Sequence, residues 1–388
     1  MSPTPIQWTD VTWNPVRGCS RVSEGCRYCY AERDAARKNE NPKLPGYHGF
    51  SRFVQIGGKP VPQWTGIVST VHHKMTEPLH WSKPKRIFVN SMSDLFHEAV
   101  SDNDLLGLFA VMANSHIATG VTKTHTFQIL TKRHERMLDF VGRLKWRTAM
   151  AMCQEIKPDG SVGNMLLNYV PFLKGTLKAI SRGTAGSLIR SSQEWMPPQI
   201  HLGVSVEDQA NAEKRIPALL KTPAAIRFVS YEPALGPVDF RPWLGIGPVR
   251  DRGLDWIIAG GESGPNARPP NPDWFRAVRD ACRSFGPDNG VRERAGPSRF
   301  QLENTVPDPF RPVHFFFKQW GDWSPEKPCW IKKSSKRYSH KTAAWARDGS
   351  RYNALNPPAD HFPSTIMYRV GKAKAGRLLD GREWNQMP

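Results

Sequence analysis

Residues 86–94 read RIFVNSMSD, an apolar run that ends in a cluster of polar residues. The run RIFVN is rich in β-branched and aromatic side chains, which is typical of a buried strand. A helical pattern follows from about Asp102. Strand, polar loop and helix in this order are the repeating unit of a parallel sheet.

The same pattern recurs along the rest of the chain. The further apolar runs are 126–130 (TFQIL), 201–206 (HLGVSV), 227–230 (RFVS), 255–259 (DWIIA) and 314–317 (HFFF). Polar residues follow each run, and in a parallel barrel all such loops lie on the face where ligands bind. We therefore predict an α/β fold with a partial (β/α) barrel of parallel strands. A doubly wound open sheet, which also binds ligands at the C-terminal ends of its strands, is the alternative.

Two long stretches interrupt this rhythm, at about 145–198 and about 283–312. Both lack a clear strand, are rich in basic residues, Gly, Ser and Pro, and exceed the usual length of a connection. We predict that they are insertions in a barrel domain over residues 1–330. Residues 331–388 are predicted to form a basic C-terminal extension that packs on the barrel.

The chain is strongly basic. Its 388 residues include 54 Lys and Arg against 35 Asp and Glu, for a formal charge of +19. Basic side chains attract polyanions over long range and release counterions from phosphates, so we expect a nucleic acid or nucleotide partner. The stretch 332–351 adds Tyr338 and Trp345 to its lysines and arginines, a mix that suits phosphates and base stacking or else forms a solvated basic surface.

The composition, with 39% hydrophobic and 23% charged residues, is that of a folded globular protein. The sequence contains no apolar run close to the roughly 20 residues of a membrane span. The N-terminal residues MSPTPIQWTD lack the basic-then-apolar pattern of a signal peptide. We expect a cytoplasmic protein with no membrane partner; its oligomeric state is not indicated.

Three of the six cysteines fall in residues 14–33, NPVRGCSRVSEGCRYCYAER. Cys19, Cys26 and Cys29 have the spacing C-x6-C-x2-C, while Cys153, Cys282 and Cys329 are scattered. Three thiolates can hold three irons of a cubane cluster and leave the fourth iron open for another ligand. The pattern therefore predicts a [4Fe–4S] site in a reducing compartment.

A structural zinc site is the alternative interpretation of these cysteines. Such a site needs four protein ligands, so a distant residue such as His48 would have to complete it. Six residues between Cys19 and Cys26 also exceed the usual two to four of zinc fingers. On this alternative the chain would be a non-enzymatic zinc- or cluster-containing nucleic-acid-binding protein.

The segment CSRVSEGCRYCYAE resembles the cluster loop of the radical SAM superfamily, whose common spacing is C-x3-C-x2-C with an aromatic residue beside the last cysteine. This chain has three more residues between its first two cysteines. The ending C-x2-C-Y-A is similar to that of spore photoproduct lyase and its relatives. More closely, the whole chain resembles an uncharacterised family of mostly phage- and prophage-encoded radical SAM-like proteins, in stretches such as TWNPVRGC, FVNSMSDLFHE, LGVSVEDQ and WIIAGGESGPNARP.

The resemblance implies that polar residues at the strand ends hold S-adenosylmethionine. By barrel position, Ser91, Ser93 and Asp94 are expected at its amino group, Lys132 or Arg133 at its carboxylate, and Ser205 and Glu207 at its ribose. Gly260, Gly261 and Glu262 look like the superfamily's Gly-Gly-Glu motif but follow a late strand, so they are expected at the adenine or the substrate. The strand-end residues that are expected to line the substrate pocket are Tyr231, Glu232, Arg268, Lys318 and Gln319. A structural ion pair is the alternative for Glu232 and for Glu262.

The resemblance also implies a reaction. An electron donor such as flavodoxin or ferredoxin would reduce the cluster, and electron transfer into S-adenosylmethionine would release a 5′-deoxyadenosyl radical that abstracts hydrogen from a substrate. Together with the basic charge, the phage-type resemblance indicates a nucleobase in DNA or RNA as that substrate, for modification or repair. A base would have to be flipped or single-stranded to reach a buried cluster.

Overall fold

The computed structural model describes residues 4–119, 125–144, 197–244, 253–284, 313–326, 342–346, 351–352 and 365–388. The two predicted insertions lie outside the described residues except at their outermost positions, and so does most of the basic stretch 332–351, including Tyr338. The chain divides into two compact units. The first consists of Met1–Val22, Ala31–Val204 and Pro217–Arg227, and the second of Ser23–Tyr30, Ser205–Ile216 and Phe228–Pro388.

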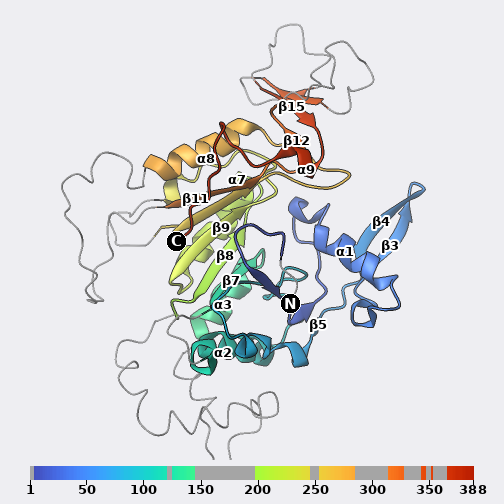
Figure 1. Cartoon of the computed structure of the whole chain (residues 1–388), viewed down its shortest axis with the longest axis vertical. Helices are drawn as coiled ribbons and strands as arrows, with labels where there is room; N and C mark the ends of the chain where they lie inside the picture. Colours follow the sequence, from blue (N-terminus) through green and yellow to red (C-terminus); the bar gives the residue numbers. More distant parts are fainter. Residues whose placement is uncertain are drawn as a thin grey trace, which may run out of the picture. The chain divides into compact units, whose positions relative to one another are not determined.

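The main sheet has seven strands in the order β1-β6-β7-β8-β9-β10-β11, and Figure 1 shows most of them by label. Their bounds are β1 Val11–Trp13, β6 Arg86–Val89, β7 Thr126–Thr131, β8 Ile200–Ser205, β9 Ile226–Tyr231, β10 Trp256–Gly260 and β11 His314–Gln319. The strands pair in parallel from β1 to β8 and from β9 to β11. All six apolar runs of the sequence are strands of this sheet.

The strand order distinguishes the two predicted architectures. Each strand of the sheet follows its neighbour in chain order, without the reversal that defines a doubly wound sheet. Because parallel crossovers are right-handed, a steady order places successive helices on one face, as in a barrel. The mixed α/β class and the parallel sheet are confirmed, and the order is consistent with a partial barrel.

Strand register brings the strand ends to a common edge within each unit. In the first unit Trp13 pairs with Val89, and Val89 with Ile129. In the second unit Tyr231 pairs with Ala259, and Ala259 with Phe317. The polar residues that follow these positions therefore start at the same edge of the sheet.

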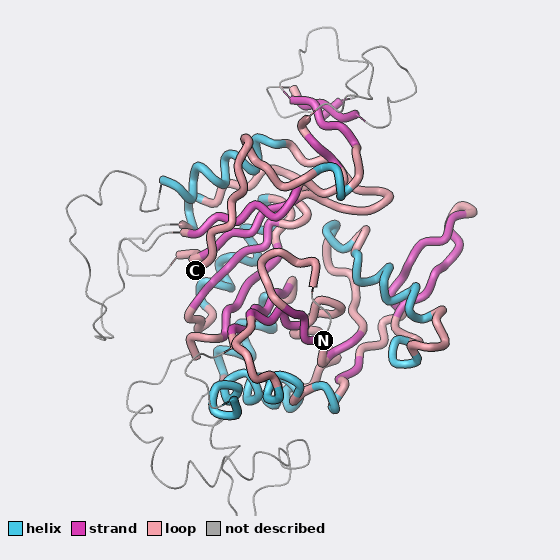
Figure 2. Tube along the Cα trace, in the orientation of Figure 1, coloured by secondary structure: helices cyan, strands magenta, loops and turns pink. Residues whose placement is uncertain are grey.

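Helices α2 (Asp102–Thr119) and α3 (His134–Arg143) complete the core of the first unit. The rings of Phe109 on α2 and Phe140 on α3 lie 5.5 Å apart, and both contact Phe96. A hairpin of β3 (Ser51–Ile56) and β4 (Lys59–Trp64) lies beside α1 (Tyr30–Asn39), as Figure 2 shows. The buried Glu32 of α1 joins them by accepting a hydrogen bond from the Trp64 backbone.

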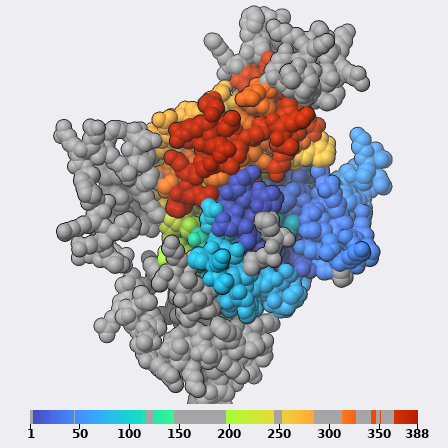
Figure 3. Space-filling model, in the orientation of Figure 1, coloured from blue at the N-terminus to red at the C-terminus, as the bar shows by residue number. Residues whose placement is uncertain are grey.

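The second unit packs α8 (Pro272–Ser284) on β11, where the rings of Phe275 and Phe317 lie 5.1 Å apart. A four-stranded antiparallel sheet follows, in the order β12-β15-β13-β14. The C-terminal residues lie beside β11, since the Phe317 backbone donates to the carbonyl of Trp384, and Figure 3 shows them in red next to the orange of residues 313–326. The boundary predicted near residue 330 stays a prediction.

Helix α7 spans Gln209–Lys221, and the remaining described elements are short. The short helix and strands are α9 Lys372–Ala375, β2 Val16–Arg17, β5 Ser69–Thr70, β12 Trp323–Ser324, β13 Thr342–Trp345, β14 Arg351–Tyr352 and β15 Thr365–Arg369. The 3-10 helices are η1 Glu24–Cys26, η2 Pro45–Tyr47, η3 His72–Lys74, η4 Glu77–His80 and η5 Arg241–Trp243. Among the described residues, no helix combines the length and apolar character of a membrane span.

Candidate functional site

The loop after β6 ties the start of the chain to the strand ends of the first unit. The Asn14 side-chain oxygen accepts hydrogen bonds from the Ser91 hydroxyl and the Met92 backbone, both at 3.1 Å. The Ser93 hydroxyl donates to the carbonyl of Val16 at 2.9 Å. Ser91 and Ser93 therefore position the residues that lead into Cys19, and their predicted role at the amino group of S-adenosylmethionine stays a prediction.

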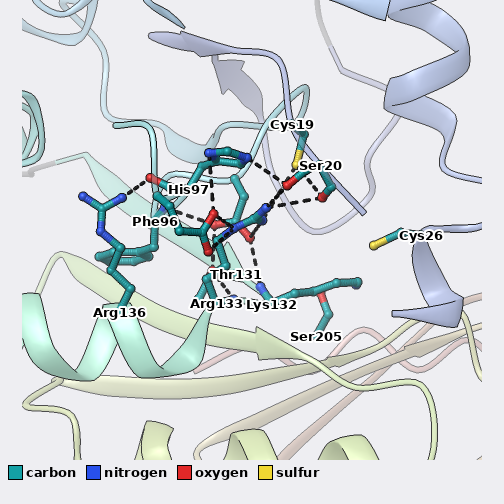
Figure 4. Close-up of polar contacts among 12 residues, drawn as sticks. Cys19, Ser20, Cys26, Phe96, His97, Thr131, Lys132, Arg133, Arg136 and Ser205 are labelled. Atoms are coloured by element: carbon teal, nitrogen blue, oxygen red, sulfur yellow. Dashed lines mark hydrogen bonds and ion pairs between the residues drawn. The ribbon is translucent and has the colours of Figure 1, made fainter. Parts of the chain in front are cut away.

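Asp94 is the centre of a buried network at the ends of β6 and β7. Figure 4 labels its partners Phe96, Thr131, Lys132 and Arg133. Its carboxylate accepts hydrogen bonds from the Thr131 hydroxyl at 2.7 Å, the Lys132 backbone at 3.0 Å and the Phe96 backbone at 3.0 Å. It also forms an ion pair with Arg133 at 3.1 Å. With four bonds inside the protein, Asp94 fixes the turn that carries Lys132 and Arg133.

Arg133 links this network to the first cysteine. Its buried guanidinium donates to the Ser20 hydroxyl at 2.7 Å and to the Cys19 sulfur at 3.9 Å, and it pairs with Glu98 at 2.9 Å. Burial alone would lower the pKa of Arg133, but Asp94, Cys19 and Glu98 together raise it. The side chain predicted at a cofactor carboxylate is thus a cation bound to Asp94, Glu98 and Ser20.

His97 is a buried member of the same network. Its Nδ1 accepts a hydrogen bond from the Ala99 backbone at 3.1 Å, so a neutral ring carries its proton on Nε2 and donates to the Ser20 hydroxyl at 2.9 Å. Burial and the charge of Arg133 lower the pKa of His97. The neutral imidazole therefore fits this site better than the imidazolium.

The lowered pKa of His97 predicts a pH dependence of stability. In the unfolded chain His97 titrates near pH 6.5, whereas in the folded chain its pKa is lower. The contribution of the neutral His97 to the free energy of unfolding is therefore fully present above pH 6.5. It is lost as the pH falls through the pKa of the folded state. The slope in that window is at most about 1.4 kcal/mol per pH unit. Urea unfolding between pH 7.5 and 5.5 should show a shallower dependence for His97→Gln than for wild type. Equal slopes would contradict the assignment, and the exposed His72→Gln is the control.

Glu207 holds the segment before Cys26 in the second unit. Its fully buried carboxylate pairs with Arg215 at 2.9 Å and accepts a hydrogen bond from the Ser23 hydroxyl at 3.0 Å. The same arginine donates to the carbonyl of Ser205 at 2.7 Å. A Cβ on Gly25 would lie 2.4 Å from a Glu207 oxygen, so a glycine is needed for this approach. The predicted ribose contacts of Ser205 and Glu207 stay predictions.

Glu262 holds the same segment from another strand end. Its carboxylate binds the Arg268 guanidinium in a bidentate pair at 2.6 and 2.8 Å. Arg268 in turn donates to the Glu24 carbonyl at 3.0 Å and lies over the Tyr28 ring, 5.3 Å from its centroid. Glu262 therefore forms an ion pair that, through Arg268, reaches the residues on either side of Cys26. Its predicted contact with the adenine or the substrate stays a prediction.

Glu232 also forms the ion pair that the alternative interpretation expects. Its carboxylate lies 3.0 Å from the Lys318 ammonium, and Ser230 donates to it at 3.3 Å. A Cβ on Gly260 would lie 2.5 Å from a Glu232 oxygen. A Cβ on Gly261 would lie 2.1 Å from the Trp320 carbonyl. The two glycines of the Gly-Gly-Glu stretch therefore allow a close approach at the ends of β9, β10 and β11.

Two other residues expected on this face have different surroundings. The Gln319 side chain donates to the Ser263 hydroxyl at 3.3 Å. Tyr231 is fully buried; its ring contacts Phe275, and its hydroxyl donates to the Gly236 carbonyl. Gln319 and Ser263 remain at the strand ends, whereas Tyr231 belongs to the core.

The three clustered cysteines are of intermediate exposure. Cys19 belongs to the first unit, and Cys26 and Cys29 to the second. Backbone hydrogen bonds from Cys26 to Ser23 and from Cys29 to Cys26 form tight turns. Within the described ranges, no three His, Cys, Asp or Glu side chains are grouped as they would be around a bound metal ion. Cys153 and Cys329 lie outside the described ranges.

Sequence reasoning missed the residues that hold the cysteine segment, defined here as residues 19–30. Arg215 was not singled out, and Arg268 was expected beside a substrate. Ser20 and Ser23 carry no signal in the sequence that singles them out. Two of the pairs are local in sequence, Glu207 with Arg215 eight positions apart and Glu262 with Arg268 six apart, whereas Arg133 and Asp94 are 39 positions apart.

The chain belongs to a family described as protein of unknown function (DUF5131), whose family model matches residues 3–288 and 309–388. The chain matches no curated protein and no solved structure.

Proposed function

We propose that this chain is a radical SAM enzyme whose [4Fe–4S] cluster is held by Cys19, Cys26 and Cys29. The observation that carries the proposal is the support of the cysteine segment. In the first unit the Asp94–Arg133 pair contacts it, and in the second the pairs Glu207–Arg215 and Glu262–Arg268 contact it. Burying a charged pair carries a desolvation penalty. Several such pairs around one loop therefore favour a loop whose position is needed for function.

The chemistry of the cysteine donors supports the proposed cluster. Three partly exposed cysteines within eleven positions are suited to iron, and a cluster with three cysteine ligands keeps one iron open. When bound, the reduced cluster supplies one-electron cleavage of S-adenosylmethionine to a 5′-deoxyadenosyl radical. The electron would come from a donor such as flavodoxin or ferredoxin.

The chain's own residues then divide into two groups. Asp94, Arg133, Glu207 and Glu262 position the cysteine segment through hydrogen bonds and ion pairs. The strand-end residues Ser91, Ser93, Lys132 and Ser205, with Glu232, Gly260 and Gly261, are the candidates that would bind and orient S-adenosylmethionine.

A nucleobase in nucleic acid is the proposed substrate class. The net charge of +19 supports it, since excess basic side chains favour association with phosphates. No residue of the described strand ends is assigned to that base.

Anaerobic reconstitution with iron and sulfide, followed by electron paramagnetic resonance of the dithionite-reduced protein, tests the cofactor. We expect the signal of a reduced [4Fe–4S] cluster, and a change in that signal when S-adenosylmethionine is added, because the open iron gains a ligand. Stoichiometric zinc without a cluster would instead support the zinc-containing binding protein.

The same reduced protein tests the substrate class through the rate at which 5′-deoxyadenosine forms. We expect single-stranded DNA or RNA to increase this rate, because a substrate that donates a hydrogen atom to the 5′-deoxyadenosyl radical converts it to 5′-deoxyadenosine. An unchanged rate with both nucleic acids would reject the nucleic-acid substrate and leave the cofactor assignment standing.

A further inference from the structure

Arg133 is the buried cation nearest to the first cysteine in the first unit's network. Its side chain is 4% exposed, and it donates to the Cys19 sulfur at 3.9 Å and to both the carbonyl and the hydroxyl of Ser20, at 3.3 and 2.7 Å. Figure 4 shows these contacts converging on the residues around Cys19. A guanidinium always carries its positive charge, so this sulfur has a permanent cation beside it.

The position of the guanidinium is fixed from several directions. Asp94 holds one nitrogen at 3.1 Å, and Glu98 holds another at 2.9 Å. Asp94 is itself held by Thr131 and two backbone amides. These ion pairs hold the Arg133 guanidinium beside Cys19.

We propose that Arg133 is a positioning residue that raises the reduction potential of the cluster bound at Cys19. This inference rests on the proposed function. Reduction adds negative charge to the cluster, and a nearby cation and an N–H···S hydrogen bond stabilise that charge. Loss of Arg133 would also leave the carboxylates of Asp94 and Glu98 without their cation, which shifts the potential in the same direction.

A potentiometric titration of the reconstituted cluster, followed by electron paramagnetic resonance, tests the inference. Arg133→Gln is expected to move the midpoint to a more negative potential than wild type. Arg133→Lys keeps the positive charge but loses the planar set of guanidinium N–H donors. Its midpoint potential should lie between those of wild type and Arg133→Gln. Iron and sulfide content, measured on each sample, shows that equal clusters are compared.

Two further variants separate the effect of Arg133 from a general loss of charge or fold. Arg143→Gln removes the same charge from the end of α3, where Arg143 is 60% exposed and pairs with Asp139, and should leave the midpoint unchanged. Glu98→Gln removes a carboxylate from Arg133. Because Glu98 is 67% exposed, this variant should fold normally and move the midpoint to a less negative potential by a smaller amount.

The outcomes distinguish this inference from the proposed function. A wild-type chain that takes up no cluster contradicts the proposed function itself. A full cluster whose midpoint is the same in wild type and Arg133→Gln overturns the role of Arg133. If Arg133→Gln does not fold, Glu98→Gln decides: a shift to a less negative potential supports the inference, and no shift overturns it.

Discussion

Glu207→Ala is expected to lower the free energy of unfolding by about 3–5 kcal/mol, the cost of removing one partner of a buried ion pair. Glu207 is 0% exposed and its partner Arg215 only 4%, so the remaining guanidinium would stay buried without its carboxylate. The Ser23 hydroxyl would lose its acceptor as well. Urea unfolding of the metal-free chain, followed by circular dichroism, measures this loss as a lower midpoint.

Matched variants identify the source of the loss. Glu207→Gln keeps an acceptor for Ser23 and Arg215 but removes the charge, so a smaller loss is expected. The double variant Glu207→Ala/Arg215→Ala should lose less than the sum of the two single variants, because they share one interaction. Asp239→Asn, in an exposed pair with Arg241, should leave the midpoint nearly unchanged. If Glu207→Ala unfolds at the same urea concentration as wild type, the Glu207–Arg215 pair does not stabilise the fold.

The parallel sheet could be predicted because its signal is local. A buried parallel strand is a short apolar run, and β9 and β10 are buried at nearly every position. The predicted starts at Asp102 and Pro272 are those of α2 and α8. The first strand, β1, was not predicted, because Val11–Trp13 is only three residues long and carries no clear pattern.

The support of the cysteine segment could not be predicted because its contacts are not local. Arg268 and Glu24 are 244 positions apart, and Arg133 and Asp94 are 39 apart. Polar residues at strand ends indicate a site, but the sequence does not say whether a carboxylate there faces a ligand or an arginine. Glu262 is an example: the Gly-Gly-Glu stretch predicts a contact with the adenine or the substrate, which stays a prediction, and the structure pairs its carboxylate with Arg268.

Cys26→Ala is expected to abolish the reconstituted cluster, with loss of its paramagnetic signal and of nearly all bound iron and sulfide. A cubane held by three cysteines and one open position loses a necessary protein ligand when one thiol is removed. The change should spare the fold, since the thiol is of intermediate exposure and its one described side-chain contact is Ser23 at 4.0 Å. Metal analysis and electron paramagnetic resonance of wild type and variant, reconstituted side by side, measure the effect.

Two controls make this result specific for the cysteine segment and for iron. Cys282→Ala removes a buried thiol on α8, whose pKa is raised by burial, and should keep the full cluster. His48→Ala separates the two metals: a zinc site completed by His48 would lose metal with this change, whereas a three-cysteine cluster would not. If the wild-type chain binds zinc, and both Cys26→Ala and His48→Ala lose it, the result contradicts the proposed cluster. A fourth protein ligand would leave no open position for S-adenosylmethionine.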